Sequence, residues 1–247
     1  MSGPPLRHVP RGQGSQAGHP TVVPMFYRVS RSALVPLTHA LYRPRIEGKD
    51  NVPMTGGVIL ASNHLSFIDS FAIPLAAPRQ VRFLAKEEYW TGQGLGGRVR
   101  AGFFDAVGMI PVDRNSSRAA QESLDQALRV LRDGDAFGIY PEGTRSRDGR
   151  LYRGRTGVAW LALTAGVPVV PVGLLGTQDI QPIGARFPKL AKVTVRFGAP
   201  IGVERFAAMP AGRGRRQLTD EVMDAIAALT GQERVDAYNE VPGARPT

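Results

Sequence analysis

The chain of 247 residues contains no cysteine and only four histidines. The absence of cysteine excludes disulfides, zinc–thiolate sites and thiol nucleophiles. His8, His19 and His39 lie in the first forty residues, so His64 is the only imidazole in the rest of the chain. A histidine-rich metal site is therefore not expected, and a reaction that needs a base near neutral pH has one strong candidate.

Lysine is also scarce, with four residues, so the positive charge comes almost entirely from arginine. Lysine and arginine together number 31 against 21 aspartates and glutamates, which gives a formal net charge of +10. Such a surface favours an anionic partner, which can be a phosphate group, a nucleic acid or an acidic lipid. Hydrophobic residues make up 43% of the chain and charged residues 21%, a composition typical of a globular protein.

The N-terminal twenty residues lack hydrophobic periodicity and do not resemble a secretory signal peptide, so we expect a disordered, cytoplasmic N-terminus. Between residues 25 and 42, apolar residues recur at steps of three and four beside arginines. This pattern fits either a helix at a membrane interface or a helix packed on the domain, and Pro36 would kink it in both cases. Residues 156–178 carry no charge, but they divide into a helix ending at Gly166 and a β-branched strand, so a membrane-spanning helix is not expected.

Short apolar runs alternate with helical patterns from residue 56 onward. The alternation predicts an α/β fold, a single-domain layered sandwich with a mostly parallel central sheet flanked by helices, plus an N-terminal amphipathic helical segment. Helices are expected at residues 117–132 and 218–229, with Arg213, Arg215 and Arg216 in the loop before the second helix. Strands are predicted at residues 58–62, 81–85, 109–112, 136–140, 167–175 and 193–197.

The first candidate site is AsnHisLeuSerPheIleAsp at residues 63–69, directly after the predicted strand 58–62. Functional loops gather at this C-terminal edge of parallel strands. If the chain turns between His64 and Asp69, the carboxylate can bond one imidazole nitrogen and leave the other to take a proton from a hydroxyl group. The alternative is a loop histidine beside an aspartate that only caps a helix.

A second candidate site, TyrProGluGlyThrArgSer at residues 140–146, also follows a predicted strand. Its turn combines a carboxylate, the open backbone of Gly143, the hydroxyl group of Thr144 and the guanidinium group of Arg145, a set that suits a phosphorylated polyol. We assign binding to Arg145 and not to the arginines that follow it, because a run of charge is usually a solvated face.

A third sequence, GlyMetIleProValAspArg, spans residues 108–114. Arg114 at its end either joins Arg145 at a phosphate group or pairs with Asp113. The chain has no Walker lysine after a suitable glycine and no GxSxG turn, so P-loop phosphoryl transfer and a serine-esterase mechanism both lose support.

These three sequences and ValProValValProValGly at residues 167–173, taken in this order, resemble the four motifs of the glycerolipid acyltransferases, the 1-acyl-glycerol-3-phosphate acyltransferase family. The resemblance covers about residues 44–200, and PheLeuAlaLys at residues 83–86 fits the segment between the first two motifs. Enzymes of this family transfer a fatty acyl group from a thioester to a hydroxyl group of a glycerol phosphate or lysophospholipid. They work at a membrane surface and without a metal.

The resemblance implies a role for each matching residue. His64 would be the general base, and Asp69 would orient it. The acceptor site would comprise Glu142, Gly143, Thr144 and Arg145, with Lys86 and Arg114 assisting at the phosphate and Pro171 in the acyl-donor region.

The resemblance does not reach residues 1–40 or the C-terminal tail, but together with the composition of these ends it gives four expected parts of the chain. Residues 1–20 would be a disordered tail, residues 21–43 an amphipathic membrane-interfacial segment, residues 44–230 the acyltransferase domain and residues 231–247 a loosely ordered tail. The basic surface and the amphipathic segment fit together if the acceptor is a lipid drawn from an anionic bilayer.

We expect an enzyme that makes phosphatidate from lysophosphatidate, with acyl-CoA or acyl carrier protein as the thioester co-substrate and no other cofactor. It would be peripheral, on the cytoplasmic face of the cell membrane, in contact with an anionic membrane surface and not with nucleic acid. One alternative is the same chemistry on another lysophospholipid or glycerol-phosphate acceptor. The other is a noncatalytic basic module that binds membranes or nucleic acid. The oligomeric state stays open.

Overall fold

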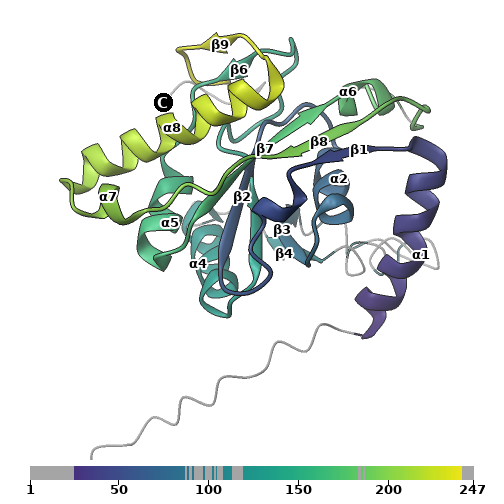
Figure 1. The fold of residues 1–247 in the computed structure, drawn as a ribbon, viewed down its shortest axis with the longest axis horizontal. Coiled ribbons are helices and arrows are strands. Elements are labelled where there is room, and N and C mark those ends of the chain that lie inside the picture. Colours follow the sequence, from purple (N-terminus) through teal and green to yellow (C-terminus); the bar gives the residue numbers. More distant parts are fainter. Residues whose placement is uncertain are drawn as a thin grey trace, which may run out of the picture.

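The computed structural model describes residues 25–86, 88, 91, 97, 102, 104, 108–112, 119–182, 185 and 187–240. A seven-stranded sheet with the order β1-β8-β7-β2-β5-β3-β4 forms its centre (Figure 1). The β7–β8 pair is antiparallel and the other neighbouring pairs are parallel, which confirms the predicted α/β fold. The strands of this sheet are β1 (Arg45–Glu47), β2 (Val58–Ser62), β3 (Val81–Lys86), β4 (Met109–Val112), β5 (Ala136–Ile139), β7 (Val169–Leu175) and β8 (Thr194–Phe197).

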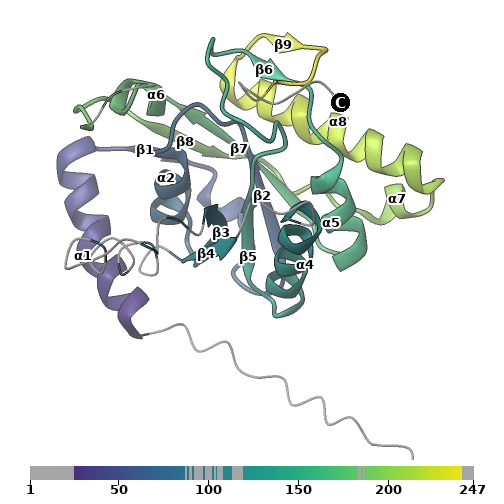
Figure 2. The same cartoon turned by 180° about the vertical axis from the view of Figure 1, so that it is seen from behind.

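Helices cover both faces of this sheet, so its central strands are buried on both sides (Figures 1 and 2). In β2, Val58 and Leu60 join the apolar core on the side of α2, while Ile59 and Ala61 join the core under α4, α5 and α8. This explains why β2 reads as an unbroken apolar run without alternation. The helices are α1 (Met25–Tyr42), α2 (Asp69–Ala76), α4 (Ala119–Arg132), α5 (Gly157–Ala165), α6 (Thr177–Ile180), α7 (Glu204–Ala207) and α8 (Ala211–Thr230), with a 3-10 turn at Lys49–Asn51.

Helix α8 begins seven residues before the predicted start at residue 218, so the placement of Arg213, Arg215 and Arg216 in a loop was wrong. Arg216 forms an ion pair with Asp220 one helical turn later, and its Nη1 donates a hydrogen bond to the backbone oxygen of Gly154 at 2.9 Å. The glycines in the first turn of α8 disfavour a helix, and these contacts of Arg216 stabilise it.

The C-terminal segment is held against the domain as far as residue 240, contrary to the expected loose tail after Gly231. Strand β9 (Arg234–Val235) pairs in parallel with β6 (Leu151–Tyr152). The Gln232 side chain contacts Asn63, and the Asn239 side chain donates to the backbone oxygen of Arg145 at 3.1 Å. Residues 241–247 lie outside the described part of the chain.

The two segments considered for membrane contact fold differently. The uncharged stretch at residues 156–178 becomes α5 and β7, as predicted. The amphipathic stretch becomes α1, which contains Pro36 and contacts α2. Among the described residues, the structure has no helix with the length and hydropathy needed to cross a bilayer. The expected tail at residues 1–20 lies outside the described residues.

Candidate active site

The loop that follows β2 brings His64 and Asp69 together, as the turn inferred from the sequence requires. His64 Nδ1 lies 2.8 Å from Asp69 Oδ2. The same carboxylate oxygen accepts hydrogen bonds from the backbone N–H groups of Leu65 at 2.6 Å and Ser66 at 2.8 Å. Asp69 is buried at the first residue of α2, where the positive end of the helix dipole also favours a negative charge.

This contact assigns the protons on the imidazole ring. A carboxylate accepts but does not donate, so the proton of neutral His64 lies on Nδ1 and points toward Asp69. Nε2 is then free to accept a proton from another group. The His64 side chain is 16% exposed, while that of Asp69 is completely buried. The pair therefore has one member that a substrate can reach and one that only the protein touches.

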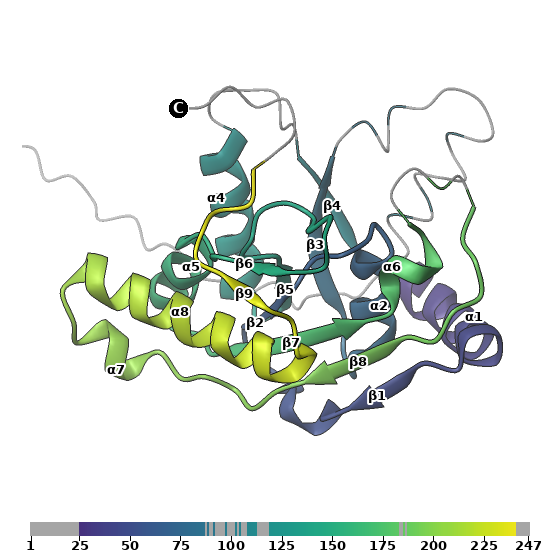
Figure 3. The same cartoon turned by 90° about the horizontal axis from the view of Figure 1, so that it is seen from above.

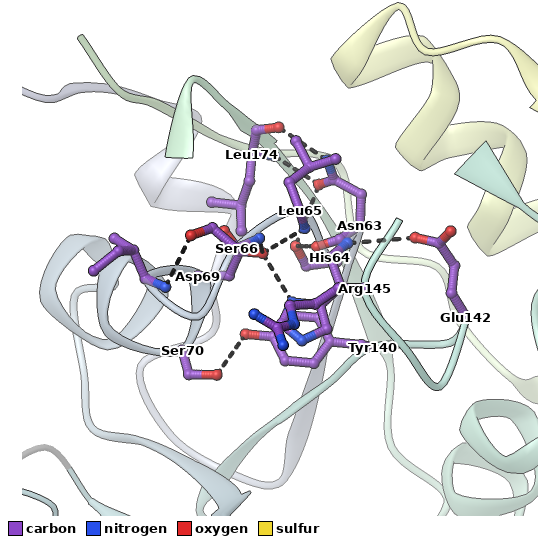
Figure 4. A network of polar contacts seen from close by, with 12 residues as sticks. Asn63, His64, Leu65, Ser66, Asp69, Ser70, Tyr140, Glu142, Arg145 and Leu174 are labelled. Carbon is purple, nitrogen blue, oxygen red and sulfur yellow. Dashed lines mark hydrogen bonds and ion pairs between the residues drawn. The ribbon is translucent and has the colours of Figure 1, made fainter. Parts of the chain in front are cut away.

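An aromatic ring fixes the plane of the imidazole. The Tyr140 ring stacks on His64 with 3.8 Å between ring centroids and 7° between planes (Figure 4). The Tyr140 hydroxyl group shares a 2.9 Å hydrogen bond with Ser70 Oγ in α2. Burial and the nearby Asp69 raise the pKa of Tyr140 well above its usual value, so the phenol stays uncharged. The Phe83 ring also stacks near Tyr140, with 5.5 Å between ring centroids.

The turn at residues 140–146 is hydrogen-bonded directly to the loop that carries His64. The Ser146 N–H donates to the backbone oxygen of His64 at 2.8 Å, and the turn closes through a Gly143 N–H bond to the Tyr140 oxygen at 3.0 Å. Gly143 has φ of 78°, a left-handed conformation that favours glycine. The two candidate sites found in the sequence are thus one site in the structure.

Glu142 faces the protein backbone within this site. Its Oε1 accepts from the His64 N–H at 3.3 Å, and its Oε2 accepts from the Tyr152 N–H at 3.0 Å. The side chain is 1% exposed, and burial raises its pKa from 4.5 to about 7 against the opposing effect of the two hydrogen bonds. Both carboxylate oxygens are therefore occupied in holding the loop, and the predicted contact of Glu142 with an acceptor stays a prediction.

The other acceptor residues of the turn are open. Arg145 and Gly143 are exposed and Thr144 is half-buried. In Figure 4 the Arg145 side chain is drawn in front of Tyr140 and His64. Among the described residues, the Arg145 guanidinium group makes no hydrogen bond or ion pair, so it is available to an anion.

Three predicted residues are not brought to this site by the described structure. The backbone of Lys86 ends β3, but its side chain is not described, and Arg114 lies outside the described residues. Pro171 lies in β7 and packs near Gly198 and Leu229, on the face of the sheet that α8 covers. Within the described residues, no group of three or more acidic or histidine side chains is placed to hold a metal ion. The expected metal-free reaction stays a prediction.

Asn63, for which the sequence predicts no role, anchors the loop. Its Oδ1 accepts from the Leu174 N–H at 2.8 Å, and its Nδ2 donates to the Leu174 oxygen and to Gln232 Oε1, both at 2.9 Å. An asparagine directly after a buried strand is the one sequence signal for this role, because a buried amide needs partners.

An apolar pocket lies on the α2 face of the sheet, next to the site. It has a volume of about 540 Å³, and two residues of the His64 loop, Phe67 and Ile68, line it. The remaining walls come from the C-terminal half of α1, from α2, from β1 and β8, and from the segment after α6. Representative lining residues are Thr38, Tyr42, Phe71, Leu75, Pro188 and Val195.

Comparison with known proteins agrees with this architecture. A family model described as Acyltransferase matches residues 43–175. The chloroplastic 1-acyl-sn-glycerol-3-phosphate acyltransferase BAT2 of Brassica napus is 30% identical over 60% of this chain and 41% of its own length. The 1-acyl-sn-glycerol-3-phosphate acyltransferase of Bacillus subtilis is 26% identical over 75% of this chain and 87% of its own length.

The crystal structure of the 1-acyl-sn-glycerophosphate acyltransferase PlsC from Thermotoga maritima has the same fold. It matches with a TM-score of 0.60 and 24% identity over 82% of each chain. The chain spans only 40% of the length of the plant relative from Arabidopsis thaliana and 41% of that of the Brassica protein. The motif resemblance is confirmed by the match to the family model, which covers more than half of the chain. The chain belongs to the acyltransferase family.

Proposed function

We propose that this protein transfers a fatty acyl group from a thioester, acyl-CoA or acyl carrier protein, to the free hydroxyl group of 1-acyl-sn-glycerol 3-phosphate, giving phosphatidate. The observation that carries the proposal is the 2.8 Å contact of His64 Nδ1 with the buried Asp69, placed beside the exposed Arg145 turn. Several relatives are named for this acyltransferase activity, and they support the choice of acceptor.

In the proposed reaction, His64 Nε2 takes the proton of the acceptor hydroxyl group as its oxygen attacks the thioester carbonyl carbon. The C–S bond of the resulting tetrahedral intermediate then breaks, and the leaving thiolate takes the proton back from the imidazolium. Asp69 stabilises the imidazolium between these two steps. A general base contributes about 10²–10⁴-fold, so much of the remaining acceleration comes from holding the two substrates together.

The acceptor phosphate fits the turn at residues 143–145. Arg145 offers a planar guanidinium group without a protein partner among the described residues, and such a group binds phosphate through two parallel hydrogen bonds. Gly143 and Thr144 offer a backbone and a hydroxyl group beside it. We assign Lys86 and Arg114 to assist at the phosphate, as the family motifs imply. Glu142 contributes by holding the His64 backbone.

The apolar pocket is suited to a fatty acyl chain. Phe67 and Ile68 link it to the catalytic loop, so a chain in the pocket would place its carbonyl end toward His64. The position of Pro171 on the other face of the sheet does not support a direct contact with that chain.

The lipid acceptor requires contact with a bilayer. We assign α1 to the membrane interface, on the cytoplasmic face, as a peripheral attachment. The exposed Leu37 and Leu41 on its last turns support this assignment.

The test is mass spectrometry of the products formed from defined lysolipids with competing acyl-CoA and acyl carrier protein donors. We expect phosphatidate from lysophosphatidate as the dominant product. Transfer to lysophosphatidylcholine or to glycerol 3-phosphate in its place would assign another acceptor to the same machinery. No transfer to any acceptor would favour a noncatalytic basic module, in which the His64–Asp69 pair has no evident use.

A further inference from the structure

The exposed apolar side chains of this protein are not scattered. Among the described residues, six large hydrophobic side chains are exposed, and Phe187 and Leu190 have the largest exposed fractions, at 80% and 72%. Leu37 and Leu41, on the last turns of α1, are two more of the six. Single exposed hydrophobic residues are normal on a protein surface, but a cluster of them marks an interaction site.

All four residues lie within two positions in the sequence of residues that line the apolar pocket. Leu37 and Leu41 share the last turns of α1 with Thr38 and Tyr42, which line the pocket. Phe187 directly precedes Pro188, which also lines the pocket, and Leu190 lies two residues after it. Figures 1 and 3 show the segment between α6 and β8 next to the C-terminal end of α1.

The same segment has charge of one sign. Lys189 and Lys192, two of the four lysines in the chain, alternate with the apolar residues and are exposed. No aspartate or glutamate occurs from residue 180 to residue 203. Two bulky apolar side chains alternate with lysines in a stretch that contains no acidic residue. This pattern fits the surface of an anionic bilayer, which has acyl chains inside and negatively charged headgroups outside.

We propose that residues 187–192 are a second membrane contact, which works with α1 to seat the apolar pocket on an anionic bilayer. Phe187 and Leu190 enter the boundary between headgroups and acyl chains, and Lys189 and Lys192 contact anionic headgroups. The proposal rests on the proposed function in its choice of a lipid partner. It adds that the protein attaches through two segments next to its pocket, so that a lipid acyl chain passes from the bilayer to the pocket without crossing water.

The test is sedimentation of the full chain with vesicles of phosphatidylglycerol and phosphatidylcholine, and with vesicles of phosphatidylcholine alone. The double variant Phe187→Ser/Leu190→Ser should bind the mixed vesicles at least about tenfold more weakly, because it removes two bulky apolar groups from the interface. The variant Lys189→Gln/Lys192→Gln should bind anionic vesicles about fivefold more weakly for each lysine removed. Its binding to neutral vesicles should change little.

Met54→Ser is the matched control. Met54 is also exposed, at 62%, but it lies before β2 and neither it nor its sequence neighbours line the pocket, so its loss should leave vesicle binding unchanged. The thermal unfolding midpoint checks that each variant is folded. Vesicle binding is measured without turnover, so it still reports on the contact if the proposed reaction is wrong.

Turnover of short-chain, fully dissolved substrates completes the test. We expect Phe187→Ser/Leu190→Ser to retain wild-type turnover on them. Wild-type vesicle binding by this variant would overturn the proposal. An equal loss of soluble turnover, which would place the segment in substrate binding, or a change in oligomeric state, which would make it a protein interface, would also overturn it.

Discussion

At the scale of single residues, the protein fixes the His64 ring from several directions. Asp69 holds Nδ1, the Tyr140 ring lies parallel to the imidazole, and the backbone of His64 is bonded by Glu142 on one side and Ser146 on the other. These restraints leave Nε2 with one direction in which to accept a proton. Small losses of alignment in such a site are costly to the rate.

Replacing Tyr140 tests the ring stack. Tyr140→Leu should lower kcat up to about tenfold with KM nearly unchanged, because a stacked aromatic pair contributes about 0.5–1.5 kcal/mol. Tyr140→Phe keeps the stack and loses only the hydrogen bond to Ser70, so it should restore most of kcat. Steady-state kinetics of the two variants measures this. Equal kcat in the leucine variant and the wild type would show that the stack does not position His64.

Glu142 gives a pH dependence of stability. Its pKa is about 7 when folded, against 4.5 as the ordinary value, so the folded protein keeps a proton that the unfolded chain releases as pH rises through this interval. The free energy of unfolding should therefore fall by up to about 3 kcal/mol between pH 4.5 and 7 from this group alone. When unfolding by denaturant is measured across this pH range, the free energy of unfolding should fall less in the variant Glu142→Gln than in the wild type. Parallel curves for variant and wild type would refute the assignment.

The sequence predicted the pairing of His64 with Asp69 on the condition of a turn between them, because these residues lie five apart in one loop. The sequence did not predict the hydrogen bonds of Asn63. The partners of Asn63, Leu174 and Gln232, lie more than a hundred residues away, and local spacing carries no information about such contacts. The role of Tyr140 was missed for the same reason.

At the scale of elements, the buried strands were the easiest part to predict. All six predicted strands are present, each with ends within two residues of those expected, because strands covered on both faces are continuous apolar runs bounded by turns. The start of α8 was missed because Gly212 and Gly214 disfavour a helix locally. Tertiary packing explains one of them, since a Cβ atom on Gly214 would lie 2.4 Å from the backbone oxygen of Phe206.

Two alanine substitutions in α8 separate packing from helix propensity. Gly214→Ala should lower the free energy of unfolding by about 1–3 kcal/mol, since α7 would have to move. Gly212→Ala meets nothing within 4 Å and should leave stability unchanged or raise it slightly. The comparison needs only the midpoint of thermal unfolding for each. A Gly214→Ala protein as stable as Gly212→Ala would mean that the close contact of α7 and α8 is not required.

At the scale of the whole molecule, the two faces of the central sheet have different roles. The face covered by α4, α5 and α8 forms an apolar core, while the α2 face carries the pocket beside the His64 loop. The strand order was beyond prediction, because it places β1 beside β8 and β2 between β7 and β5 through contacts distant in sequence. The C-terminal segment completes the site from a distance through Gln232 and Asn239.

The net charge of +10 gives a prediction at the same scale. Binding to anionic vesicles should weaken as salt concentration rises, since screening acts on exposed lysines and arginines. The apolar contribution of Phe187 and Leu190 should remain. Sedimentation at several salt concentrations measures both parts. Binding that does not change with salt would contradict the role given to the exposed cations.

The central claim is that His64, oriented by Asp69, is the base for acyl transfer. The most direct test is the rate of thioester consumption by His64→Ala with lysophosphatidate as acceptor, measured beside vesicle binding by the same protein. We predict that the rate falls by about 10²–10⁴-fold while vesicle binding is unchanged. A His64→Ala protein that consumes the thioester at the wild-type rate would contradict the account.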